Sequence, residues 1–203
     1  MERDILENNY LVVTGELTED FTFSHEVFGE GFYQSKISVV RESGTVDLLP
    51  IIVSERLVDV KEKWVGQFVK IYGQFRSFNY HENEKNRLVL SVFVRELEVL
   101  EVLYPQNEIV LDGYICKAPI YRKTPLGREI ADVLIAVNRN YGKSDYIPCI
   151  LWGRTARFAS TFEVGTRVLV TGRIQSRDYI KKLSEELCEK RTAYEVSVSK
   201  VEM

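Results

Sequence analysis

The chain repeats its own pattern once along its length, and this repeat restricts the fold more than any other feature. At a spacing of 98 residues, Gly15 matches Gly113, and residues 47–53 (DLLPIIV) match residues 145–151 (DYIPCIL). The other matches, at spacings of 98 and then 99, are Gly29/Gly127, Arg41/Arg139, Gly66/Gly165, Gly73/Gly172, Ser77/Ser176 and Tyr80/Tyr179. We therefore predict two tandem domains, residues 1–104 and 105–203, that share one fold.

Each half is predicted to be mostly β-structure. Residues 68–73 and 167–172 alternate apolar and polar positions, are rich in β-branched residues and end in glycine. One helix is expected between the third and fourth strands of each half, over residues 54–64 and 154–162, because a glycine follows each segment closely. The pattern predicts an all-β chain of two tandem OB folds, five-stranded Greek-key barrels with one helix between strands 3 and 4. A β-sandwich also fits the strand pattern, but the helix position favours the barrel.

Charge is divided unevenly between the halves. Residues 1–104 carry 11 Lys and Arg against 18 Asp and Glu, whereas residues 105–203 carry 16 against 12. The first half is therefore at −7 and the second at +4, although the whole chain is at −3. A polyanion should prefer the second half.

Several function classes lack the residues that they need. The three cysteines are widely spaced and only two histidines are present, so neither a disulfide framework nor a transition-metal site is expected. No Ser/His/Asp or Cys/His set and no glycine-rich phosphate loop is recognisable, so we predict a non-enzymatic protein without cofactor. The first residues are charged and no apolar run approaches the roughly 20 residues that span a bilayer. We expect no membrane segment and a cytoplasmic location.

Six segments of the second half, taken in order, resemble the bacterial single-stranded DNA-binding protein family. They are residues 107–113 (NEIVLDG), 122–127 (RKTPLG), 134–139 (LIAVNR), 150–154 (ILWGR), 165–173 (GTRVLVTGR) and 175–179 (QSRDY). The resemblance implies sequence-nonspecific binding of single-stranded DNA in replication, recombination or repair, by base stacking on aromatic side chains and by phosphate contacts from Lys and Arg.

The resemblance also places the contact residues. The implied stacking aromatics are Tyr141, Tyr146, Trp152 and Tyr179. The implied cationic and polar contacts are Arg122, Lys123, Arg139, Arg154, Arg173, Gln175, Arg177 and Lys181. Strand alternation alone gives a compatible pattern, because Tyr146, Pro148, Ile150 and Trp152 share one face and the apolar Ile147, Cys149 and Leu151 share the other.

Other interpretations of these residues stay open. Tyr146 and Trp152 could instead cover a protein contact. Arg173 and Arg177 could belong to a solvated sheet edge. The charged segment 181–191, which matches a hairpin arm of the family, could equally be a solvated helix or loop.

The first half departs from the family pattern. Ser43, Leu48 and Ser54 stand where the second half has Tyr141, Tyr146 and Trp152, and only Tyr80 is kept. Its outer strand face then reads Leu48, Pro50, Ile52, which favours burial against protein. Its other aromatics are expected to serve core and loop packing; they are Phe21, Phe23, Phe28, Phe32 and Tyr33. We predict a degenerate, structural or protein-binding first half.

The family resemblance also bears on assembly and partners. Members with two OB folds in one chain pair to reach four, so we expect a homodimer with the aliphatic face of the first half in the contact. Replication or repair proteins are possible partners, but the acidic recruiting tail of the family is not seen after residue 199. Two rival functions are a primosome-type OB protein that bridges DNA and replication proteins, and a scaffold without DNA binding.

Overall fold

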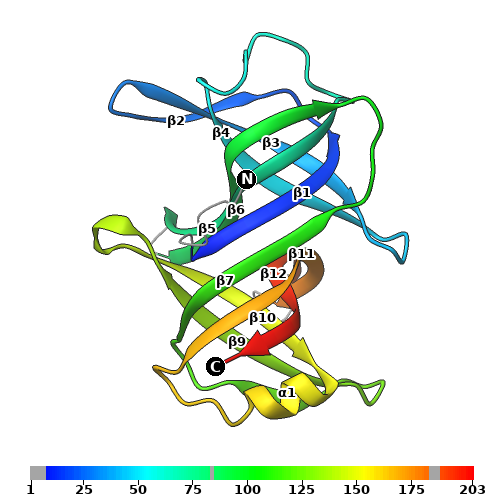
Figure 1. The fold of residues 1–203 in the computed structure, drawn as a ribbon, viewed down its shortest axis with the longest axis vertical. Coiled ribbons are helices and arrows are strands. Elements are labelled where there is room, and N and C mark those ends of the chain that lie inside the picture. Colours follow the sequence, from blue (N-terminus) through cyan, green and yellow to red (C-terminus); the bar gives the residue numbers. More distant parts are fainter. Residues whose placement is uncertain (1–7, 83–84, 183–187) are drawn as a thin grey trace.

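A computed structural model describes residues 8–82, 85–182 and 188–203 of the chain. These residues form twelve strands in one continuous sheet and one α-helix (Figure 1). The first half holds β1 (Asn9–Leu17), β2 (Thr22–Val27), β3 (Glu30–Val40), β4 (Val46–Ser54), β5 (Phe68–Glu82) and β6 (Lys85–Leu100). The second half holds β7 (Asn107–Ile115), β8 (Ile120–Lys123), β9 (Glu129–Asn138), the 3-10 turn η1 (Asn140–Gly142), β10 (Ser144–Trp152), α1 (Gly153–Ala159), β11 (Arg167–Lys182) and β12 (Cys188–Glu202).

Each half closes into a barrel of five main strands. In the first half the order is β3-β4-β6-β5-β1, and β1 pairs back with β3. In the second half the order is β9-β10-β12-β11-β7, and β7 pairs back with β9. The third and fifth main strands run parallel in both halves, and β2 and β8 add a short outer strand. The predicted all-β, OB-type fold is confirmed.

The barrel interiors are filled by alternate residues of each strand. On β10, Ile147, Cys149 and Leu151 are fully buried, as the alternation predicted, but Ile150 on the opposite face is buried as well. Gly172 lies at a bulge where β11 bends, and a Cβ atom there would overlap the carbonyl of Ser197. Glycine is therefore required for the barrel to close at this point.

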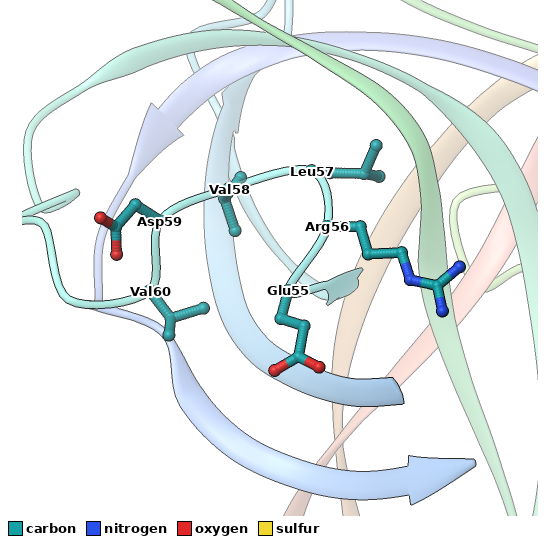
Figure 2. A pocket seen from close by; sticks show the side chains of 6 residues that line it. All are labelled: Glu55, Arg56, Leu57, Val58, Asp59 and Val60. Atoms are coloured by element: carbon teal, nitrogen blue, oxygen red, sulfur yellow. The ribbon is translucent and has the colours of Figure 1, made fainter. Parts of the chain in front are cut away.

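The helix predicted for residues 54–64 is wrong, because this segment folds into successive turns. Asp20 accepts the backbone N–H of Trp64 at 2.8 Å, and the indole of Trp64 donates to the carbonyl of Asp59 at 2.9 Å. These bonds compete with helical ones, and they hold Trp64 and Val58 in the barrel core. Figure 2 shows the open hollow on the turn; its lining residues are consecutive, namely Glu55, Arg56, Leu57, Val58, Asp59 and Val60.

In the second half the helix is present but shorter than predicted. It begins at Gly153 and ends at Ala159, whereas residues 154–162 were expected. Within the described part of the chain, no helix is long and apolar enough to cross a membrane.

The two barrels join through a pair of antiparallel strands, β1 and β7. Leu11 lies opposite Ile109, and these two residues are equivalent in the repeat. On either side of them, Asn9 faces Leu111 and Val13 faces Asn107. The repeat matches Asn9 with Asn107 and Val13 with Leu111, so it converts one of these pairs into the other. The barrels are therefore related by a local two-fold axis between the strands, and they lie side by side in Figure 1.

A buried polar contact is made twice across this junction. Asp47, whose side chain is fully buried, pairs with Arg41 and accepts the backbone N–H and hydroxyl of Ser176 at 2.6 and 2.7 Å. Arg41 also donates to the carbonyl of Ser176 at 2.8 Å. In the symmetric contact Asp145 pairs with Arg139 and accepts the backbone N–H of Ser77, and Arg139 donates to the Ser77 carbonyl. The Ser77 hydroxyl differs from that of Ser176, because it accepts the backbone N–H of Tyr146. Several of the matches that revealed the repeat are thus residues that hold the barrels together.

Candidate nucleic-acid interface

The outer face of the second barrel exposes aromatic rings on β10. Tyr146 is 42% and Trp152 is 37% exposed, which is unusual for large side chains on the central strand of a sheet. The indole of Trp152 donates to the hydroxyl of Ser197 on the adjacent strand β12 at 3.1 Å. This bond fixes the ring orientation and leaves part of the ring open to solvent.

Strand β11 adds cations and a third ring to the same surface. Arg177 is exposed, and its guanidinium carbon lies 5.9 Å from the centre of the Tyr179 ring. Tyr179 is 37% exposed, and Arg173 lies half-buried closer to the middle of the strand. A row of cations that ends beside an exposed ring can meet a phosphate backbone and a base together.

A buried carboxylate lies beneath this row. Glu195 on β12 is only 6% exposed; it accepts a hydrogen bond from the Gln175 amide at 2.9 Å and lies 3.7 Å from the Arg177 guanidinium. Gln175 is itself 7% exposed, so its burial does not fit the predicted DNA contact. Sequence reasoning missed Glu195, because its place opposite Gln175 depends on the register of the β11–β12 hairpin.

Strand β8 and helix α1 supply further cations. Arg122 and Lys123 are exposed on β8, and Arg122 pairs with Asp132 at 2.8 Å. Both members of this pair are partly solvated, so transferring the guanidinium to a phosphate costs little. Arg154 is exposed on α1.

The predicted contact residue Arg139 has other partners in the structure. Arg139 is occupied at the barrel junction by Asp145 and the carbonyl of Ser77, so we leave it out of the interface. The side chains of Tyr141 and Lys181 lie outside the described residues.

The aromatics of the first barrel behave differently from one another. Phe21 is buried edge-on against Trp64, in agreement with a packing role. Phe23 is 59% exposed but packs edge-on against Tyr33, with ring centres 5.7 Å apart. Phe28 is 103% exposed, so the packing prediction is wrong for this residue. Phe28 lies in the turn between β2 and β3 and has a positive φ of 50°.

Comparison with known proteins agrees with this geometry. The family described as "Single-strand binding protein family" matches residues 106–203. Single-stranded DNA-binding protein B of Bacillus subtilis is 38% identical over 80 residues, which cover 36% of this chain and 71% of that protein. Single-stranded DNA-binding protein 2 of Listeria innocua is also 38% identical over 80 residues, but the match covers only 50% of its length. The chain belongs to the single-strand binding protein family, as its sequence segments predicted.

A solved structure extends the likeness to the whole chain. The wild-type single-stranded DNA-binding protein of Thermus aquaticus superposes with a TM-score of 0.77 over 96% of this chain and 91% of that one. Sequence identity is only 19%, so this likeness concerns the fold.

Proposed function

We propose that the chain binds single-stranded DNA without sequence preference, through the outer face of the second barrel. The observation that carries the proposal is the joint exposure of Tyr146, Trp152 and Tyr179 on that face. Flanking cations complete the surface; they are Arg122, Lys123, Arg154, Arg173 and Arg177. The relatives are named single-stranded DNA-binding proteins, which supports the same ligand.

Each part of this surface has a distinct task in the proposal. Every base has a π-face, so stacking on the three rings tolerates any sequence, and the bases of a duplex are not free to stack in this way. The arginines meet phosphates, and Glu195 holds Arg177 beside Tyr179 so that both can meet one nucleotide. None of these tasks is catalytic. We propose protection of single strands during replication, recombination or repair.

Salt dependence tests the phosphate contacts. Replacing Arg173 and Arg177 together by alanine should weaken oligo(dT) binding. The slope of log binding constant against log salt concentration should also become shallower by about 1.4, since each phosphate contact contributes about 0.7 to it. Labelled oligo(dT) titrated at several salt concentrations measures the slope. An unchanged slope would show that these arginines do not meet phosphates.

The homodimer remains a proposal, and the first barrel offers a surface for it. Leu48 on β4 is 46% exposed, and Val40 and Val46 beside it are equally open, so this aliphatic cluster is not used between the barrels of one chain. Light scattering should give twice the chain mass, and Leu48→Glu should shift the population toward monomer, with Val65→Glu in an exposed turn as control. A monomeric wild type would contradict the dimer, and a dimeric Leu48→Glu would place the contact elsewhere.

A further inference from the structure

The outer face of the first barrel also carries aromatic rings, at positions that differ from those of the second barrel. Phe32 on β3 and Phe93 on β6 lie with ring centres 5.8 Å apart. Strand β4 runs between β3 and β6, and it places the small Ser54 opposite Phe32.

The second barrel has the reverse arrangement at the equivalent place. There the central strand carries the large Trp152, opposite the buried Ile130 on β9 and bonded to Ser197 on β12. The two barrels thus fill one area of surface in opposite ways, with a ring on the middle strand in one and a ring on each flanking strand in the other. The loss of an aromatic at Ser54 is offset by Phe32 and Phe93.

A histidine and two arginines extend this pair of rings into a row across the barrel. The imidazole of His25 stacks on Phe32 with ring centres 5.1 Å apart and an interplanar angle of 11°. The guanidinium carbon of Arg76 lies 3.7 Å from the centre of the Phe93 ring, and that of Arg95 lies at 5.6 Å. Phe78, two residues after Arg76 on β5, is exposed as well.

We propose that this row, defined by His25, Phe32, Phe93 and Arg76, is a second stacking surface for the single strand that occupies the second barrel. The proposal rests on the proposed function. Aromatic rings interleaved with cations suit bases and phosphates, whereas a protein contact would favour a purely apolar face. The first barrel therefore takes part in binding, in contrast to the degenerate role predicted from Ser43, Leu48 and Ser54.

The row lies apart from the aliphatic cluster proposed for the homodimer. In the β4–β6 pairing Phe93 lies beside Ile52, four residues along the strand from Leu48 and thus about 13 Å away. DNA and a second copy of the chain can therefore occupy different parts of the first barrel.

Two lengths of labelled oligo(dT) test the row on the intact chain. One OB fold covers about 4–16 nucleotides, so a strand of about 12 nucleotides fits the second barrel alone and one of about 30 reaches both. Phe93→Ala should weaken binding of the longer strand by roughly 5- to 150-fold and leave the shorter one unchanged. Tyr104→Ala, an exposed ring in the segment between the barrels, is the matched control and should change neither.

A second variant tests the row even if Phe93→Ala fails to fold. Phe93→Trp in a Trp152→Phe background places an indole in the row, and oligo(dT) of about 30 nucleotides should quench it beyond the signal of Trp152→Phe alone. Two results together would overturn the inference: no added quenching of the new indole, and binding of the longer strand by Phe93→Ala that equals that of the wild type. The proposed function would still stand if the wild type binds the shorter strand. If Phe93→Ala has half the wild-type mass in light scattering but binds the longer strand with full affinity, the row is a protein contact and the inference is overturned. Failure of the wild type to bind either strand would refute the proposed function itself.

Discussion

Replacing Asp47 by alanine is expected to lower the free energy of unfolding by about 3–5 kcal/mol, because it removes one partner of a buried ion pair. Arg41 would lose its carboxylate in a mostly buried position, and the N–H and hydroxyl of Ser176 would lose their acceptor. Since this contact joins two barrels, the loss should appear in the cooperative unfolding of the whole chain. Urea denaturation followed by circular dichroism measures it.

Asp112→Ala is the matched control for this prediction. Asp112 also pairs with an arginine, Arg167 on β11 at 2.6 Å, but both side chains are partly exposed to solvent. Removal of such a surface pair should cost about 0–1 kcal/mol. Equal losses of unfolding free energy for Asp47→Ala and Asp112→Ala would contradict the conclusion that the Asp47 contact is a buried ion pair that stabilises the junction of the barrels.

The same contact predicts an acid-side dependence of stability. Burial by itself would raise the pKa of Asp47, but the Arg41 guanidinium and the two hydrogen bonds from Ser176 together hold it below its ordinary value. A lowered pKa in the folded state means that the stabilisation is complete above the unfolded value of about 3.9 and is lost as pH falls through the folded value. On acidification the free energy of unfolding of Asp47→Ala should therefore fall less than that of the wild type. An equal fall in both proteins would contradict this prediction.

Replacing Trp152 by alanine is expected to weaken oligo(dT) binding by about 1–3 kcal/mol, or roughly 5- to 150-fold, because one stacking platform is lost. Trp152→Phe keeps an aromatic face and should retain most of the affinity. Fluorescence anisotropy of labelled oligo(dT) measures both variants.

The control for this second prediction is Tyr104→Ala, which removes an exposed ring away from the proposed surface. Its affinity should match that of the wild type. Equal affinity of Trp152→Ala and the wild type, with the fold intact by circular dichroism, would show that DNA does not stack on β10.

The sequence was sufficient to predict the repeat and the barrels because both depend on local patterns. Glycines at turns and bends, and alternating apolar residues, specify the strands without knowledge of their partners. The predicted helix at 54–64 failed because Asp20, far away in sequence, binds the backbone of Trp64 and stabilises a turn instead.

The candidate site was predictable only where one strand determines it. Alternation along β10 is enough to place Tyr146 and Trp152 on one face. Glu195 depends on a hairpin register, and the contact of Phe32 with Phe93 depends on two strands that flank a third. Arg139 was predicted to meet DNA, because nothing in its own segment shows that Ser77 of the other barrel lies within reach.

Titration of intrinsic tryptophan fluorescence with oligo(dT), against a duplex of equal length, tests the central claim most directly. Trp152 is the tryptophan on the proposed surface and Trp64 is buried in the first barrel, so the signal reports the site. Single-stranded DNA should quench the fluorescence strongly, and the duplex should have much less effect because its bases cannot stack on the exposed rings. Equal quenching by duplex and single strand, or none by either, would contradict binding by base stacking on the second barrel.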